Sequence, residues 1–268
     1  MSAGMKILVL NPFAGEAREF ERCATVKRPE TEIVFDTIAG VYPLNYVTYI
    51  YYRHKCAEAV VERIVRAEDE GFDAVFISCC YDPGLGEARE LVDIPVASAF
   101  EAGAHYANAM SQRYSVIATE PKTAHCYREL AQLYGTDSKL ASVRHIGLSA
   151  RDSYADTTPP EVIVERTLAV ARQCVEEDGA EAILMGCTLQ SCPLTVAGAS
   201  SSGDDARSGA PIIDPVLVGL KTTEFMVDLQ RAGLPTVSRY GTWQKPPIEE
   251  VVQLSPAMAA RMAGAARR

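Results

Sequence analysis

Two cysteines in this sequence end segments of the same type. Residues 71–79 end in Cys79 and residues 179–187 end in Cys187, and each segment contains, in order, a glycine, an acidic residue, an alanine, three apolar residues, a small residue and the cysteine. The same offset of 108 residues carries Asn11 to Thr119, and both of these residues end apolar runs. The sequence therefore predicts an internal repeat, with Cys79 and Cys187 facing each other across a cleft between two similar lobes.

This arrangement of thiols favours proton transfer. A cysteine at the end of a strand, followed at once by the start of a helix, has its thiolate stabilised by free amides and by the helix dipole. The same amides bind a carboxylate or a developing enolate oxygen. One such thiolate indicates nucleophilic catalysis. Two thiolates on opposite sides of a substrate indicate that one removes a carbon-bound proton while the other delivers one to the opposite face.

The alternative interpretation of each cysteine alone is an inert buried thiol, because free cysteines are commonly buried. The matched repeat favours catalysis for the pair. The thiol of Cys80 is expected to be structural, and Cys192 lies five residues after Cys187, which is not a recognised redox spacing. The remaining cysteines are expected to be packing residues: Cys23, Cys56, Cys126 and Cys174.

Other kinds of site have weak support in the sequence. His54 and His125 each lie near a cysteine but lack a second pair of ligands at zinc spacing, so no metal site is expected. The glycine-containing segments lack the GxGxxG and GxxxxGK[ST] patterns of nucleotide-binding loops. We therefore expect an enzyme without a metal or another cofactor.

Composition limits the class of partner. The chain has 268 residues, of which 48% are hydrophobic and 23% charged, as in globular enzymes. Its net charge of −9 argues against nucleic acid and against anionic membrane surfaces, so a small-molecule substrate is expected. The start of the chain leads into a short strand rather than a signal-peptide core, which predicts a cytoplasmic protein. We also expect a homo-oligomer.

Strands and helices alternate along the chain, and this pattern predicts parallel sheets built from βαβ units. The carboxyl ends of such strands form the binding crevice, and the two cysteines, Asn11 and Thr119 lie at such ends. The expected strands are 6–10, 32–35, 73–78, 96–98, 114–119, 142–147, 181–185 and 237–242, with Ile212 and Ile213 before a last long helix. The expected helices are 16–24, 56–70, 102–112, 122–134, 160–177 and 217–231, and a frayed helix follows Ser255.

Three connecting segments carry more specific expectations. Asp82 and Pro83 are expected to be the N-cap and first residue of a helix that follows Cys79 closely. Residues 41–52 contain five tyrosines, which form either a core or interface patch or an aromatic wall over the cleft. Residues 197–209 are rich in glycine and serine and form either a surface insertion or a mobile lid.

The motifs around the two cysteines resemble those of the aspartate/glutamate racemase superfamily, and within it the hydantoin racemase branch. Residues 78–85, Ser-Cys-Cys-Tyr-Asp-Pro-Gly-Leu, look like the first cysteine motif of that branch. Residues 185–188, Met-Gly-Cys-Thr, look like the second. The segments 6–12, 94–96, 101–102 and 212–216 fall in family order, so the resemblance spans about residues 5 to 245.

The resemblance implies two pseudo-symmetric α/β lobes with the active site between them. We place the first lobe at 1–112 plus 218–268 and the second at 113–217. It also implies cofactor-independent racemisation at a carbon next to a carbonyl by Cys79 and Cys187. By position, Asn11 and Thr119 would hold the substrate's carbonyl or carboxylate, and the amides of Cys80 and Thr188 would add oxyanion contacts.

Departures from the family pattern concern the substrate. Ala118 replaces one of two typical threonines, and Phe13 and Ala14 replace polar residues of the first loop. These changes favour an apolar or aromatic substituent on a hydantoin or an amino-acid-related substrate. The rival functions are a maleate-type cis–trans isomerase with a nucleophilic cysteine, a non-catalytic small-molecule sensor and a thiol redox protein. A related decarboxylase with one cysteine is disfavoured by the presence of both.

Overall fold

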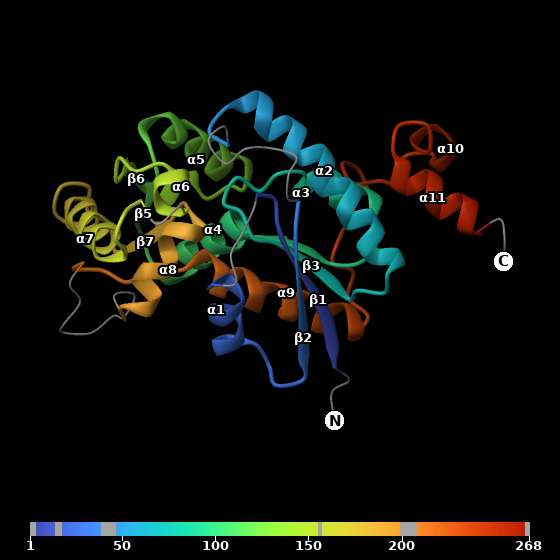
Figure 1. Cartoon of the computed structure of the whole chain (residues 1–268), viewed down its shortest axis with the longest axis horizontal. Coiled ribbons are helices and arrows are strands. Elements are labelled where there is room, and N and C mark those ends of the chain that lie inside the picture. The colour runs from blue at the N-terminus through green and yellow to red at the C-terminus, as the bar shows by residue number, and fades with distance from the viewer. Residues whose placement is uncertain (1–3, 14–17, 39–46, 155–156, 199–207, 266–268) are drawn as a thin grey trace.

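The computed structural model describes residues 4–13, 18–38, 47–154, 157–198 and 208–265. Two parallel sheets carry the fold, and helices cover their faces (Figure 1). The first half of the chain contains β1 (Met5–Asn11), α1 (Arg18–Val26), β2 (Thr31–Thr37), α2 (Ile50–Asp69), β3 (Ala74–Ile77), α3 (Leu85–Leu91), β4 (Val96–Ser98) and α4 (Ala99–Met110). The remainder contains β5 (Tyr114–Ala118), α5 (Pro121–Leu133), the 3-10 helix η2 (Asp137–Lys139), β6 (Leu140–His145), α6 (Ala150–Tyr154), α7 (Pro160–Glu176), β7 (Ala182–Met185), α8 (Thr188–Val196), β8 (Ile212–Ile213), α9 (Pro215–Arg231), α10 (Ile248–Val251) and α11 (Pro256–Ala265).

The two sheets have the same strand order. The first runs β2-β1-β3-β4 and the second β6-β5-β7-β8, with every neighbouring pair parallel. Strands β3 and β7, which precede the two cysteines, are offset by 108 residues and occupy equivalent positions. The predicted α/β architecture with two repeated lobes is therefore confirmed.

The two sheets share a central core. It contains side chains from β1 and β3 of the first sheet, from β5 and β7 of the second, and from α4 and α9, which lie between them. Gly103 of α4 permits this close packing, because a Cβ there would lie 2.5 Å from a methyl carbon of Leu184 on β7. The core therefore fixes one sheet relative to the other through two helices.

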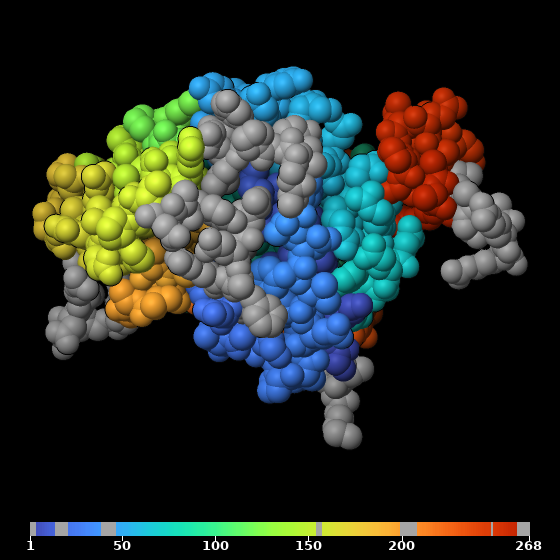
Figure 2. Space-filling model, viewed as in Figure 1, coloured from blue at the N-terminus to red at the C-terminus, as the bar shows by residue number. Residues whose placement is uncertain are grey.

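Outer helices cover the opposite faces of the sheets. Helices α2 and α3 pack over the first sheet, α11 packs on α2, and α7 packs over the second sheet. The C-terminal helices lie beside α2 and far from α7, as the red and yellow regions of Figure 2 show. The exact lobe boundaries proposed from the sequence stay a prediction.

Two local predictions are wrong. Residues 237–242 form no strand; instead, the Arg239 guanidinium donates to the carbonyls of Arg89 and Glu90 near the end of α3, which holds the segment as a loop. The helix after Cys79 begins at Leu85 with Gly84 as its N-cap, so Asp82 and Pro83 do not start it. Other boundaries differ less, except that α2 begins at Ile50 and extends six residues before the predicted start.

Some expectations fall partly outside the described residues. Of the tyrosine-rich segment, residues 41–46 lie outside them, as do residues 199–207 of the glycine- and serine-rich segment. Within the described part, Tyr49 and Tyr51 are largely exposed, and Tyr49 meets Lys122 of α5, whose Nζ lies 3.5 Å from the ring centroid. This contact joins the start of α2 to the second half of the chain.

Candidate active site

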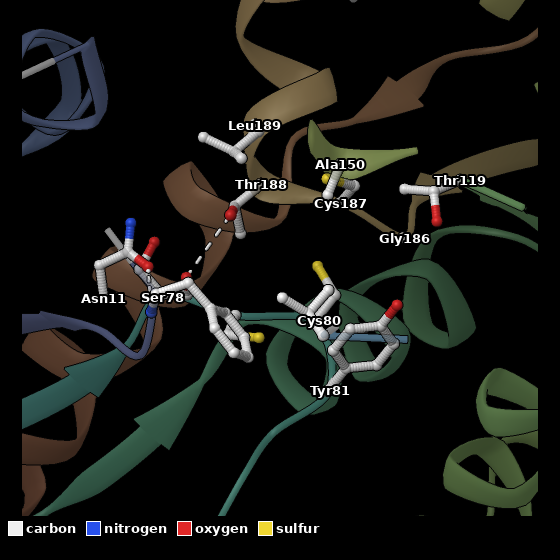
Figure 3. A pocket seen from close by; sticks show the side chains of 13 residues that line it. Asn11, Ser78, Cys80, Tyr81, Thr119, Ala150, Gly186, Cys187, Thr188 and Leu189 are labelled. Atoms are coloured by element: carbon white, nitrogen blue, oxygen red, sulfur yellow. Dashed lines mark hydrogen bonds between the residues drawn. The ribbon is translucent and has the colours of Figure 1, made fainter. Parts of the chain in front are cut away.

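A cavity lies where the carboxyl ends of the two sheets meet. All six residues expected to form the site line it: Asn11, Cys79, Cys80, Thr119, Cys187 and Thr188. Its other lining residues are Phe13, Val47, Ser78, Tyr81, Ala150, Gly186 and Leu189. In Figure 3 Cys187 and Thr188 descend from the start of α8 toward Cys80 and Tyr81, while Asn11 and Thr119 lie at opposite sides of the view. The structure thus brings residues from both halves of the repeat together.

Cys187 occupies the position that the sequence predicts. It is the N-cap of α8, and the first amides of that helix have no helical carbonyl to bond, although the Cys187 sulfur makes no capping hydrogen bond to them. The helix dipole stabilises negative charge at this place. The next residue, Thr188, donates from its hydroxyl to the carbonyl of Ser78 at 3.4 Å, the dashed line of Figure 3. One hydrogen bond therefore crosses the cleft, from the residue after Cys187 to the residue before Cys79.

The backbone before Cys187 is held tightly. Tyr127 of α5 is buried and donates from its hydroxyl to the carbonyl of Gly186. A Cβ at position 186 would lie 2.9 Å from Cζ of that tyrosine and 3.0 Å from the carbonyl oxygen of Ile117. Only glycine fits this approach without a shift, so the family-like Gly-Cys-Thr sequence has a packing reason here.

Cys79 has different surroundings from Cys187, which corrects one prediction. A turn follows it, closed by the bond from the Asp82 N–H to the Cys79 carbonyl at 3.1 Å, and α3 begins only at Leu85. Burial raises the pKa of the Cys79 thiol well above its usual value, although a hydrogen bond from the Tyr81 backbone lowers it. Cys79 is therefore a protonated thiol at neutral pH in this structure, whereas Cys187 lies at a helix N-terminus.

Asp82 shapes the turn after Cys79. Its φ of 47° lies in the left-handed region that few residues other than glycine adopt. Its buried carboxylate accepts from the Ser98 hydroxyl at 2.6 Å, and from the backbone N–H groups of Phe100 and Glu101 at 3.0 and 2.8 Å. These amides belong to the first turn of α4. Asp82 thus caps α4 rather than the helix that follows it in sequence, and a bond from the Tyr134 hydroxyl at 2.8 Å ties it to α5.

Asn11 and Thr119 end equivalent strands on the two sides of the cavity. The side-chain oxygen of Asn11 accepts from the N–H of Phe13 at 3.0 Å, which leaves the amide NH₂ as its donor toward other groups. Thr119 is buried, and its hydroxyl lies 3.3 Å from that of Thr123 in α5. Both residues can present a hydrogen-bond donor to an oxygen in the cavity.

Sequence patterns missed the supports of this site. Tyr127, on α5, was expected only as part of a helix. Its ring stacks on that of Tyr81, with centroids 5.9 Å apart. Arg53 of α2 lies over the ring of Tyr81, with its guanidinium carbon 5.1 Å from the ring centroid and its Nη1 2.6 Å from the Cys126 sulfur. In the sequence, only the glycine before Cys187 indicated that another side chain packs closely against this backbone, and that side chain is Tyr127.

Among the residues that the structure describes, no group of three or more His, Cys, Asp or Glu side chains could hold a metal ion. The eight cysteines are all free thiols. Within the described ranges, no helix is long and apolar enough to cross a membrane.

Comparison with known proteins places this geometry in a family. The family model of Asp/Glu/hydantoin racemases matches residues 7–223. The chain belongs to this family. A hydantoin racemase of Pseudomonas sp. (strain NS671) is 32% identical over 253 residues, covering 92% of this chain and 94% of the relative. This racemase is therefore an isomerase, as the cysteine motifs predict.

Solved structures agree with the fold of the racemase. An allantoin racemase from Klebsiella pneumoniae has a TM-score of 0.77 and 28% identity, covering 91% of this chain and 94% of its own. One from Pseudomonas fluorescens has a TM-score of 0.77 and 29% identity, covering 90% and 97%. The two-lobed fold is thus shared over nearly the whole chain.

Proposed function

We propose that this racemase inverts the stereocentre of 5-substituted hydantoins by a two-base mechanism that uses Cys79 and Cys187. The observation that carries the proposal is the pair itself. The two cysteines follow equivalent strands of the two sheets and line one cavity. The relatives named hydantoin racemase and allantoin racemase support the ring, because allantoin is itself a hydantoin with a ureido group at C5.

The two cysteines start the reaction in different protonation states. Cys187, at the start of α8, is the thiolate that removes the proton from C5 of one enantiomer. Cys79 is the buried thiol that gives its proton to the opposite face of the same carbon. After turnover, Cys187 holds a proton and Cys79 is a thiolate, so the opposite enantiomer is the substrate of this second form. No group other than the two thiols exchanges a proton with the substrate.

Hydrogen-bond donors around the cavity stabilise the enolate that forms between the two transfers. The amide NH₂ of Asn11 and the hydroxyl of Thr119 lie on its two sides, and the N–H of Thr188 belongs to the first turn of α8. The N–H of Cys80 completes the set by position. Donors placed where negative charge develops lower the barrier more than donors that bind the ground state.

The cavity favours a small ring with an apolar substituent. Its volume is about 40 Å³. At roughly 10–15 Å³ for each water molecule, this space holds about three or four waters. A planar five-membered ring is of this size, and a larger substituent requires the walls to part. The walls available to the substituent are apolar: Phe13, Val47, Ala150 and Leu189.

Polarimetry with separate enantiomers tests the substrate class. We expect decay of rotation with 5-benzyl- and 5-isobutylhydantoin at kcat/KM values about 10²-fold above those for aspartate and glutamate. Allantoin, with its polar substituent, should fall between these groups. A sample without enzyme corrects for spontaneous racemisation of the rings. Preference for the free amino acids would contradict the proposed substrate class.

A further inference from the structure

A buried polar cluster lies behind the start of α8. Arg22 of α1 is 3% exposed, and its Nη1 lies 2.7 Å from Oδ2 of Asp214 and 2.7 Å from the hydroxyl oxygen of Ser191. Asp214 is the N-cap of α9, and Ser191 lies on α8. None of these three residues lines the cavity between the sheets. The cluster thus joins α1 to two later helices and lies behind the wall of the cavity rather than in it.

Arg22 also reaches the backbone next to the proposed base. Its Nη2 donates to the carbonyl of Thr188 at 2.8 Å, and the hydroxyl oxygen of Ser191 lies 2.9 Å from the same carbonyl. Thr188 follows Cys187 directly. The planar guanidinium therefore fixes the peptide unit one residue after the cysteine and grips Asp214 at the same time, a geometry that one point charge does not reproduce.

Helix α8 depends on such outside contacts. It has nine residues, and Pro193 inside it lacks the N–H that would bond to the carbonyl of Leu189. Thr195, in its last turn, donates to Asp214 at 2.6 Å. Asp214 in turn accepts from the N–H of Val216 at 2.9 Å and so caps α9. Both ends of the short helix are therefore tied to the same buried carboxylate.

We propose that Arg22 is a positioning residue for Cys187: with Asp214 it holds the start of α8 so that the Cys187 sulfur faces the substrate carbon. A buried ion pair is weak evidence for stability, because packed apolar residues often stabilise a core equally well. The hydrogen bond from Arg22 to the Thr188 carbonyl is directional, so it fixes the orientation of the peptide after Cys187, which apolar packing would not do. This inference rests on the two-base function proposed above.

The two cysteine variants make the test selective. In Cys79→Ser, exchange of the C5 proton of 5-benzylhydantoin with heavy water depends on Cys187. In Cys187→Ser it depends on the minor thiolate form of Cys79, so exchange in this background starts from a lower rate. Adding Arg22→Met should slow exchange by about 10²-fold in the first background and by no more than about twofold in the second, because misplacing one base leaves the other in place. Retained exchange in the second background also shows that the chain is folded.

A conservative variant and a matched control accompany this pair. Arg22→Lys keeps the charge beside Asp214 but loses the fork that reaches Thr188, so its effect in the Cys79→Ser background should be intermediate. Arg28 lies just after α1, and within the described residues its guanidinium pairs with Asp228, with Nη1 2.9 Å from Oδ1, and with Glu224, both on α9 rather than α8. Arg28→Met should therefore leave exchange unchanged in both backgrounds.

Two outcomes overturn the inference. Equal loss of exchange in both backgrounds would make Arg22 a purely structural residue, and unchanged exchange in both would remove any role for it in the site. Failure of the proposed function looks different. In that case the single variants Cys79→Ser and Cys187→Ser would already lack opposite enantiomer preferences, before any change at Arg22.

Discussion

The ring of Tyr81 stacks on the ring of Tyr127 with centroids 5.9 Å apart and planes 13° apart. The Tyr81 backbone bonds to the thiol of Cys79, and the Tyr127 hydroxyl bonds to the carbonyl that precedes Cys187. The two rings come from different halves of the chain. This aromatic pair therefore connects the backbone segments that carry the two proposed proton-transfer groups.

Removal of one hydroxyl from this pair should reduce activity out of proportion to stability. Tyr127→Phe leaves the carbonyl of Gly186 without that bond, which costs about 1–3 kcal/mol of unfolding free energy. Tyr114→Phe is a matched control, since Tyr114 is also buried and its hydroxyl lies 2.9 Å from that of Thr136, away from the cavity. Urea unfolding should show similar losses in both variants, while kcat should fall only in Tyr127→Phe. Equal kcat values in the two variants would contradict a positioning role for the hydroxyl.

Gly186→Ala should disturb Cys187 through its backbone. The added Cβ would meet the Tyr127 ring at 2.9 Å and a backbone oxygen at 3.0 Å, so the peptide before Cys187 must shift. Since a displacement of about 1 Å can cost 10²-fold in rate, we expect a comparable fall in kcat. Gly86→Ala, in α3, serves as control, because its nearest neighbour is an Nε1 atom of Trp243 at 3.8 Å. That variant should retain full kcat and stability.

The pH dependence of stability should carry a signature of Asp82. Burial raises the pKa of Asp82 and the hydrogen bonds to its carboxylate lower it. Burial has the larger effect, so the pKa rises from 3.8 to about 6. The native state therefore holds this proton more tightly than the unfolded chain. The resulting stabilisation is complete below pH 3.8 and is lost as the pH rises through 6. A shift of this size corresponds to about 3 kcal/mol.

Urea unfolding of the wild type and Asp82→Asn between pH 4 and 7 measures this effect. The free energy of unfolding of the wild type relative to the variant should rise by up to about 3 kcal/mol as the pH falls from 7 to 4. A relative stability that falls over the same range would mean that the hydrogen bonds from Ser98, Phe100 and Tyr134 outweigh burial.

Alkylation should distinguish the two cysteines. Because thiolates are the reactive form, iodoacetamide at pH 7.5 should modify Cys187 before Cys79, whose pKa burial raises. The rate at Cys79 should keep rising with pH through 9 and above. Peptide mass spectrometry follows each site, and Cys56, whose pKa burial raises to about 12, supplies an unreactive reference. Faster labelling of Cys79 than of Cys187 at pH 7.5 would reverse the assigned starting states.

The repeat could be predicted from the sequence because each copy is a short run of neighbouring residues. Each cysteine ends a short apolar strand preceded by a glycine, so the offset between Cys79 and Cys187 identified equivalent positions before any tertiary contact was known. The same reasoning failed at Asp82. Its sequence neighbour Pro83 suggests a helix start, but the carboxylate caps α4, whose first turn lies 18 residues further on.

Long-range polar contacts could not be predicted in this way. Arg22 and Asp214 are separated by 192 positions, and nothing in either local pattern distinguishes a buried ion pair from two exposed charges. The wrongly predicted strand at 237–242 has a similar cause. Its apolar and aromatic residues suit a strand, but the side chain of Arg239 bonds to the end of α3 and fixes the segment as a loop.

Hydrogen exchange in heavy water with Cys79→Ser and Cys187→Ser tests the central claim most directly. Each variant, given each enantiomer of 5-benzylhydantoin separately, should lose racemisation while still exchanging the C5 proton, more slowly in Cys187→Ser, where the thiol of Cys79 must first lose its proton. The two variants should prefer opposite enantiomers, because each retains a base on one face of the ring. Full racemisation by either variant, or preference of both for the same enantiomer, would contradict two thiols acting on opposite faces.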